Sequence, residues 1–236
     1  MNFFKQKNDK KIILFILLVF LFSSFISYKE RWDESRDCWS PLMVAIYKNK
    51  IKKFEKLIKS KKGITYVSIC DKSDYELTPL EVAIRCENAY AVELLLKTKA
   101  YKNLDEYLLI ASGHESIRTV ALIIQYGGNP NYKDENNHTI IMQATSFSTV
   151  EVLKTILSFS SQNINIQRNK NSVTALMLAS YVKDIDKVKL LLEYKSDIKI
   201  KDNKGRTAYD YLETDYINKK CNEQQMNELR KLLKID

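Results

Sequence analysis

The stretch from Thr174 to Lys199 contains the clearest copy of a unit that recurs along the chain. It reads TALMLASYVKDIDKVKLLLEYKSDIK, with two short apolar segments separated by the polar pair Lys183 and Asp184. Each apolar segment has the 3.6-residue spacing of a helix with one buried face. The pattern predicts two helices joined by a tight turn. Such a pair cannot bury both of its apolar faces alone, so copies of the unit must stack on one another.

Five further segments open in a similar way, and the one at Glu106 is degenerate. Ser and Thr side chains cap helix starts, and Pro79 suits the first helical position, where an amide would have no partner anyway. The steps between successive openings are 38, 28, 33, 35 and 33 residues. A period of about 33 residues predicts a solenoid of stacked helix pairs. The six openings lie at Ser40, Thr78, Glu106, Thr139, Thr174 and Thr207.

The best-matching pieces of these units are SPLMVA, TPLEVA and TALMLA, with the YGGNPN loop at residues 126–131 and the segment DNKGRT. On these pieces the sequence resembles the ankyrin-repeat family over roughly Ser40 to Leu233. The resemblance implies an all-α fold, an ankyrin-repeat solenoid of helix–turn–helix units with short hairpin fingers. It also implies five repeats and a truncated repeat that caps the C-terminus, together forming a domain over residues 40–236.

The sequence departs from the family pattern in several places. The histidine that follows Thr-Pro-Leu in the family is absent throughout. Among the residues that replace the glycine between paired helices, only asparagine adopts a left-handed turn at low cost, so we expect strained or reshaped turns. The 28-residue step is about five residues short of the period near Asn103, which predicts a missing finger. The residues that replace the glycine are Asn49, Glu87, Glu115, Ser148 and Lys183.

Residues 1–30 form a segment of a different kind. Four lysines precede residues 12–26, in which thirteen of fifteen positions are apolar. A basic start followed by a short apolar run is typical of a secretory signal. As a helix the run would be about 22 Å long, short of the ~30 Å hydrocarbon core. The pattern predicts an exported chain that is either secreted, after cleavage of a signal peptide, or membrane-anchored through an uncleaved segment.

The two ends of the predicted array carry covering segments. Residues 31–39 form a charged spacer, and its Trp32 and Trp39 are expected to cover the open end of the stack. A polar helix with one apolar face is expected to cap the other end, because a terminal repeat needs a polar outer side. The apolar face of that helix consists of Met226, Leu229, Leu232 and Leu233.

The sequence offers little catalytic chemistry. It has two histidines and four cysteines, and it lacks the spacings of zinc sites, phosphate-binding glycine loops and serine hydrolases. Cys86 and His114 share one phase and would be neighbours, but two ligands do not make a zinc site. Three pairings of the four cysteines stay open. We therefore expect no enzymatic activity, no cofactor and no metal.

The net charge of +9 raises the question of nucleic acid. The lysines, however, are scattered among Asp and Glu in every unit, and no nucleic-acid motif occurs. This pattern favours a solvated lysine-rich surface. The sequence thus predicts no nucleic-acid partner.

The function then has to come from a surface. In the ankyrin family, partners dock on the concave side, which the fingers and the first helix of each unit form. Tyr, Phe and Arg supply most of the energy at protein interfaces, although the same aromatic side chains could instead pack between repeats. By phase, the candidate partner-binding residues are Tyr47, Lys48, Tyr75, Arg85, His114, Asn136, His138, Phe147, Tyr181 and Lys204.

These observations predict a monomeric, non-enzymatic module that binds another protein outside the cytoplasm and meets the membrane only through its N-terminal segment. Two alternatives stay open. One is a structural membrane-surface protein held by its anchor and its basic surface. The other is an enzyme whose site the sequence does not reveal.

Overall fold

The computed structural model describes residues 39–61, 63–70, 73–214 and 221–234, with the backbone alone at 68–70 and 73–76. The predicted signal segment, most of the predicted spacer and Trp32 lie outside the described residues. The chain divides into two compact units, Met1–Pro79 and Leu80–Asp236. In the part of the chain that is described, no helix is both long enough and apolar enough to cross a bilayer.

The first unit contains a helix pair and a β-hairpin: α2 (Pro41–Tyr47), α3 (Ile51–Lys59), β1 (Ser68–Cys70) and β2 (Ser73–Leu77). The Ser40 side chain accepts a hydrogen bond from the Met43 amide at 3.3 Å, which caps α2 as predicted. Phe54 of α3 is buried, and α2 packs against α3. Trp39 is buried as well, with its ring edge-on to Tyr47 at 5.4 Å.

The second unit is a series of helix pairs. Its helices are α4 (Pro79–Arg85), α5 (Ala89–Lys97), α6 (Asp105–Ser112), α7 (Ile117–Gln125), α8 (Ile140–Phe147), α9 (Val150–Phe159), α10 (Ala175–Tyr181), α11 (Ile185–Glu193), α12 (Ala208–Leu212) and α13 (Glu223–Leu233). Apart from β1, β2 and an isolated bridge between Lys133 and Thr139, the described residues form no β-structure. The predicted all-α solenoid fold is confirmed.

Capping side chains begin the helices of the second unit. Thr139 and Thr174 are two of the predicted openings. Each accepts a hydrogen bond from the backbone amide three residues further on, at 3.1 and 3.3 Å respectively, and so caps its helix. The second helices of the pairs are capped too, by residues that the repeat pattern did not single out. These are Asn88, Ser116, Thr149 and Asp184.

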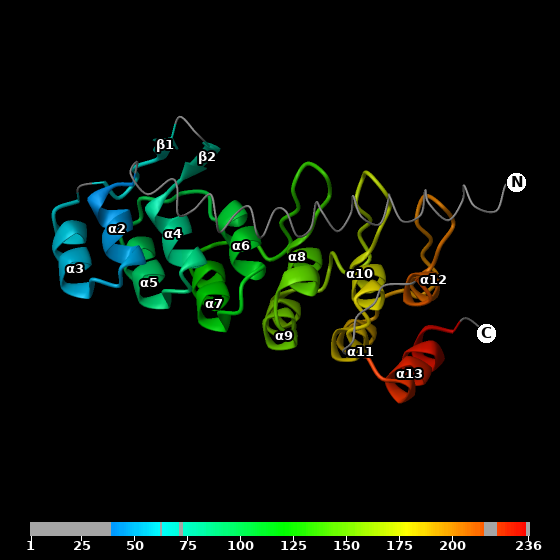
Figure 1. The fold of residues 1–236 in the computed structure, drawn as a ribbon. Helices are drawn as coiled ribbons and strands as arrows, with labels where there is room; N and C mark the ends of the chain where they lie inside the picture. The colour runs from blue at the N-terminus through cyan, green and yellow to red at the C-terminus, as the bar shows by residue number, and fades with distance from the viewer. Residues whose placement is uncertain (1–38, 62, 71–72, 215–220, 235–236) are drawn as a thin grey trace, which may run out of the picture. The chain divides into compact units, whose positions relative to one another are not determined.

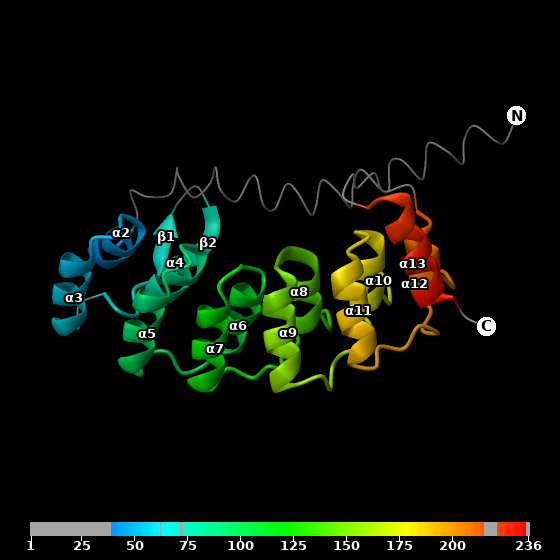
Figure 2. The ribbon, with the colours of Figure 1, turned by 90° about the horizontal axis from the view of Figure 1, so that it is seen from below.

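Neighbouring pairs bury their apolar faces against one another. Among the first helices, α6 packs on α8, α8 on α10 and α10 on α12; among the second helices, α5, α7, α9, α11 and α13 follow in the same way. Figures 1 and 2 show α7, α9 and α11 side by side in one row. Leu108, Met142 and Met177 of the first helices and Leu153 and Leu191 of the second helices are almost fully buried.

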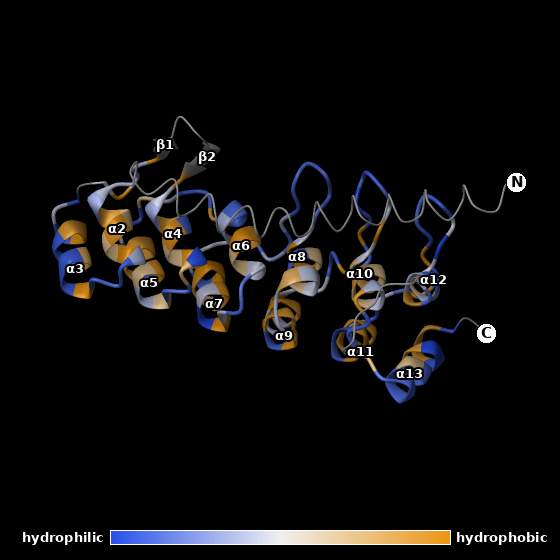
Figure 3. Cartoon of the chain, in the orientation of Figure 1, coloured by the Kyte–Doolittle hydropathy of each residue, from blue (hydrophilic) through white to orange (hydrophobic). Residues whose placement is uncertain are grey.

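The connection between α5 and α6 lacks a finger, as the short step predicts. It spans residues 98–104, all of which are described, and no β-bridge occurs there. Helix α6 begins at Asp105, with Leu104 in the capping position and no side-chain cap. The capping position therefore lies two residues before the opening expected at Glu106. The loops before α8, α10 and α12 are long, project on the same side of the helices (Figure 1) and are strongly hydrophilic (Figure 3).

The turns between paired helices take two forms. Asn49, Glu87 and Lys183 adopt the left-handed conformation, with φ of 49°, 51° and 57°, although this conformation disfavours Glu and Lys. At Ser148 the backbone is instead extended, with φ −113°, and Glu115 is not left-handed either. The expectation of strained or reshaped turns is therefore confirmed, with strain at Glu87 and Lys183 and a different shape at Ser148.

A buried lysine completes the reshaped turn after α8. Lys187 of α11 is only 6% exposed, and its Nζ donates to the carbonyl oxygens of Thr145 and Ser148 at 2.8 and 2.6 Å. A cation at a helix C-terminus satisfies carbonyl groups that have no partner within the helix and suits the helix dipole. Lys187 of one helix pair thus caps the C-terminal end of α8 in the neighbouring pair and links the two pairs.

The predicted C-terminal cap is present. Helix α13 contacts α11 and α12, and it buries Leu229 and Leu233, while Met226 and Leu232 are half-buried. Lys189 of α11 forms an ion pair with Glu228 of α13 at 2.6 Å. The cap therefore covers the last apolar face and presents a polar outer side.

Replacing Leu191 by Ala is expected to lower the free energy of unfolding by about 2–5 kcal/mol, because the substitution leaves a cavity between packed helices. Urea unfolding followed by circular dichroism measures the change. As a control, Ile117→Ala removes a side chain that is 42% exposed and should change stability by about 0.5 kcal/mol or less. A loss below about 1 kcal/mol for Leu191→Ala would contradict the repeat packing described above.

Candidate functional site

Three hairpin fingers precede α8, α10 and α12, and residues 133–138, 167–173 and 200–206 are called the finger surface below. A backbone hydrogen bond closes each finger, for example from the Asp134 amide to the His138 carbonyl at 3.1 Å. Each finger turns through a left-handed residue two positions before the capping threonine. Only the last finger uses glycine there, which adopts this conformation without strain. The turn residues are Asn137, Ser172 and Gly205, with φ of 55°, 56° and 76°.

Hydrogen bonds tie the three fingers to one another. The Asn169 amide donates to the Asn136 carbonyl at 2.9 Å, and the Asn169 side chain donates to the Glu135 carbonyl at 2.9 Å. The next contact along the row is from the Asn203 amide to the Asn171 carbonyl at 3.3 Å. Since each finger satisfies backbone groups of its neighbour, the fingers form one connected surface.

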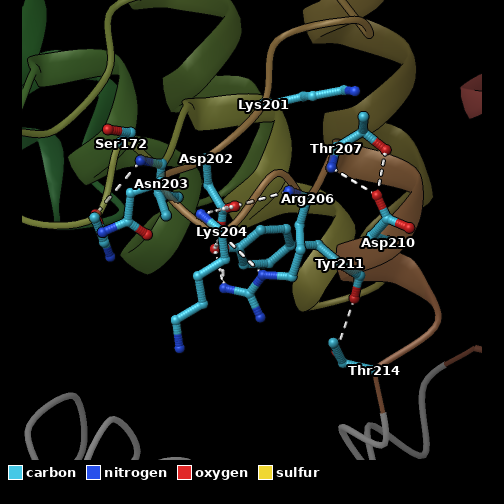
Figure 4. Close-up of polar contacts among 12 residues, drawn as sticks. Ser172, Lys201, Asp202, Asn203, Lys204, Arg206, Thr207, Asp210, Tyr211 and Thr214 are labelled. Atoms are coloured by element: carbon cyan, nitrogen blue, oxygen red, sulfur yellow. Dashed lines mark hydrogen bonds and ion pairs between the residues drawn. The ribbon is translucent and has the colours of Figure 1, made fainter.

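The last finger is held to α12 by a buried carboxylate (Figure 4). Asp202 Oδ2 accepts from Arg206 Nε at 2.9 Å and from the Tyr211 hydroxyl at 2.8 Å, and Oδ1 accepts from the amides of Lys204 and Arg206. Arg206 also lies 4.5 Å over the Tyr211 ring. Although desolvation acts in the opposite direction, the hydrogen bonds lower the pKa of Asp202 to about 2.

A second polar row runs through the turns at the other end of the first helices. Glu87 accepts a hydrogen bond from the Glu115 amide at 3.2 Å, and its carboxylate lies 3.9 Å from His114 Nδ1. The Ser148 hydroxyl donates to the His114 carbonyl, and Lys187 donates to the Ser148 carbonyl. Burial, together with the nearby charge of Arg85, lowers the pKa of His114 to about 4, so the ring is neutral at pH 7.

The sequence-predicted residues of the second unit lie at the two ends of its first helices. Asn136, His138 and Lys204 lie on the finger surface; Asn136 and Lys204 are exposed and His138 is half-buried. Tyr75 lies in β2 of the first unit, and its side chain is not described. The remaining candidates of the second unit lie at the C-terminal ends of its first helices, about 10 Å from the opposite end of the same helix for a length of seven or eight residues. They are Arg85, His114, Phe147 and Tyr181. In the first unit, Tyr47 and Lys48 lie at the C-terminal end of α2.

Several candidates have internal contacts that limit their availability. Arg85 is only 15% exposed and forms an ion pair with Glu81 of the same helix. Tyr47 packs on Trp39, and Tyr181 lies edge-on to Tyr211 at 6.4 Å. Exposed charge is carried by Lys48 and Lys204.

Sequence reasoning missed three residues, two on first helices beside the fingers and one on the middle finger. Gln143 of α8 is half-buried, and its Oε1 lies 2.7 Å from His138 Nε2. Tyr211 holds the last finger, and Arg168 begins the middle finger. Gln143 and Tyr211 each lie four positions after a capping threonine, and this shared phase was the available signal.

The cysteine and histidine pair suggested by the repeat phase has no metal-binding neighbours in the described residues. Within that part of the chain, no three His, Cys, Asp or Glu side chains lie close enough to bind one ion. Cys86 and Cys221 are free thiols, and burial raises the pKa of Cys86 to about 11. At neutral pH the Cys86 thiol is therefore protonated and a poor nucleophile.

Replacing Asp202 by Asn is expected to lower the free energy of unfolding at pH 7 by about 2 kcal/mol, at 1.36 kcal/mol for each pKa unit. The folded-state pKa is depressed, so the carboxylate stabilises the fold above its ordinary pKa of 3.8. That contribution is lost as the pH falls towards 2. Urea unfolding between pH 7 and pH 2 should show the wild-type and variant curves converging. The exposed control Glu193→Gln should stay within about 0.5 kcal/mol of wild type throughout, and a pH-independent deficit in D202N would refute the electrostatic account.

Comparison with known proteins bears on this arrangement. Residues 108–202 match the family model described as ankyrin repeats (3 copies). The chain is also similar to alpha-latrotoxin-Lg1a of Latrodectus geometricus, with 30% identity over 95 residues. That match covers 40% of this chain and only 7% of the toxin's length. Residues 108–202, from α6 to the last finger, therefore consist of ankyrin repeats, which are protein-interaction modules.

Proposed function

We propose that the chain is a non-enzymatic binding module whose second unit binds a partner protein on its concave side. That side consists of the finger surface and the first helices beside it. The observation that carries the proposal is the network of hydrogen bonds between fingers, since it fixes their backbones while Asn136 and Lys204 stay exposed. A surface that is already ordered loses little conformational freedom on binding, so more of the contact energy appears as affinity.

Side chains of the first helices support the same surface. Phe147 and Tyr181 are half-buried, and the packing of Tyr181 against Tyr211 limits its rotamers. Aromatic side chains held in this way are typical interface anchors. The second helices present a different surface, in which charged residues such as Arg118 and Glu93 pair with one another at 3.0 Å.

Site-specific photocrosslinking tests the location of binding even while the partner is unidentified. A photoreactive residue at Lys204 of the full chain should form a discrete covalent adduct in cell extract, because the side chain is exposed on the finger surface. The same residue at Lys154, which is exposed on α9, serves as the matched control. Mass spectrometry of the adduct identifies the partner, and Phe147→Ala should reduce its yield.

Two outcomes would contradict the proposed surface. In the first, the adduct forms at Lys154 and not at Lys204, which would assign binding to the second helices. In the second, an adduct at Lys204 is insensitive to Phe147→Ala and to every other concave-side substitution. The melting temperature of each variant separates lost binding from lost folding.

We further propose that residues 1–30 direct the module out of the cytoplasm, as a cleaved signal or as an anchor. The support is the basic start followed by the apolar run at residues 12–26. Fused to alkaline phosphatase in bacterial cells, residues 1–30 should give active enzyme, because the phosphatase needs disulfides that form outside the cytoplasm. Replacing Leu17 and Phe20 by Arg should abolish that activity. Equal activity of the two fusions would argue against export by this segment.

A further inference from the structure

One of the five described arginines differs from the others in having no carboxylate partner. Buried or half-buried guanidinium groups are normally paired, because an unpaired charge away from water is costly. Arg168 at the base of the middle finger is half-buried, yet no described Asp or Glu forms an ion pair with it. The other four pairs are Arg85 with Glu81, Arg118 with Glu93, Arg206 with Asp202 and Arg230 with Glu213.

No described carboxylate forms an ion pair with Arg168, although Asp134 also lies near His138 and acts on the pKa of that imidazole. The Nε atom of Arg168 is buried and has no hydrogen-bond partner among the described residues, and the same is true of the Nδ1 atom of His138. Burial lowers the pKa of His138, and the positive charge of Arg168 lowers it further. At pH 7 the imidazole of His138 is therefore neutral, and it does not offset the positive charge of the Arg168 guanidinium. Such unsatisfied polar atoms call for a physical explanation.

The two fingers around Arg168 carry an excess of positive charge. Residues 167–173 and 200–206 contain five cationic residues and one acid. The single acid is Asp202, which is buried and already bound to Arg206. Lys170, Lys201 and Lys204 are exposed. The first finger, residues 133–138, adds Lys133 together with the acids Asp134 and Glu135. The three fingers together still carry an excess of positive charge, and their field attracts negative charge to the position of Arg168.

We propose that Arg168 binds a Glu or Asp carboxylate in an acidic segment of the partner protein, and that the exposed lysines of the same two fingers attract the segment's other acids. This inference rests on the proposed function and specifies the chemistry of the partner. Because Nε is buried, the two terminal nitrogens of the guanidinium make the contact. They can form two parallel hydrogen bonds with one carboxylate, and that geometry gives specificity as well as affinity. The partner's carboxylate replaces the acid that the other four arginines find within the chain.

The composition of these fingers favours a peptide over other anions. Residues 167–173 and 200–206 contain no aromatic residue, so they offer no surface on which nucleic-acid bases could stack. Val173 is buried and Ile200 is half-buried, which leaves no apolar tip to enter a bilayer. On the neighbouring finger, the exposed amide side chain of Asn136 can donate to and accept from a peptide backbone.

The binding test uses the full chain and a defined probe. The probe is an end-capped, fluorescent twelve-residue peptide of alternating Glu and Gly, and the comparison peptide has Gln in place of Glu. Fluorescence anisotropy should show binding of the Glu peptide and at least about tenfold weaker binding of the Gln peptide. Arg168→Glu should weaken binding of the Glu peptide about tenfold or more. The affinity of Arg168→Lys should lie between those of wild type and Arg168→Glu, because lysine keeps the positive charge but cannot form the two parallel hydrogen bonds of a guanidinium.

A matched control separates the local contact from total charge. Lys154→Glu makes the same change in charge on α9, where the side chain is exposed, and should alter the affinity less than about twofold. If Arg168→Glu does not fold, Lys170→Glu provides a second reversal at an exposed position of the same finger, with the same expected direction. Equal effects of Lys154→Glu and Arg168→Glu would overturn the proposal, and so would a wild-type chain that binds neither peptide.

Anionic competitors give the remaining outcomes. Poly-uridine RNA or phosphatidylserine vesicles that bind the wild type more tightly than the Glu peptide does, and lose that binding in Arg168→Glu, would also overturn the proposal.

Photocrosslinking at Lys204 keeps the two proposals distinguishable. An adduct that persists unchanged in Arg168→Glu, but is lost in Phe147→Ala, would leave the concave-side function standing and remove the carboxylate contact.

Discussion

Burial between neighbouring helix pairs holds the second unit together, because no single pair has a core of its own. Leu108, Met142 and Met177 occupy successive first helices and are all almost inaccessible to solvent, and each helix packs on the next. Apolar contact of this kind is non-directional, so it fixes the spacing of the pairs but not the shape of the turns. Polar contacts determine that shape, and they repeat with the same period as the core.

The polar contacts form a row at each end of the first helices. At the finger end, residues 32 to 34 positions apart are joined, such as Asn137 with Asn169 and Gln167 with Lys201. At the turn end, Ser148 and Lys187 take part in bonds that span 34 and 39 residues. Stacking brings these distant residues within reach, and their hydrogen bonds then oppose sliding of one pair over the next. In the helix pairs that lack a glycine turn, these bonds help to compensate for the missing residue.

Much of this fold could be predicted, because a period of about 33 residues is visible wherever an opening carries a hydroxyl side chain. Ser40, Thr139 and Thr174 cap helices where the period places them. The prediction was less accurate at the third unit, where Leu104 precedes the helix without capping it and no hydroxyl marks the start. The site was harder to predict. Arg168 closes its finger onto Val173, five residues on, whereas the other fingers close over four. Because this finger is one residue longer, a fixed number of positions before Thr174 does not identify Arg168.

One substitution within the repeat contributes to the charge balance around Arg168. Asp134 and Asp202 each lie five positions before a capping threonine, and the corresponding residue of the middle finger is Asn169. An aspartate there would supply negative charge beside Arg168, but it could not donate the hydrogen bond that Asn169 gives to the Glu135 carbonyl. The amide thus strengthens the link between fingers and, in the same step, removes a carboxylate from the finger. Asn169 therefore contributes both to the rigidity of the finger surface and to its excess of positive charge.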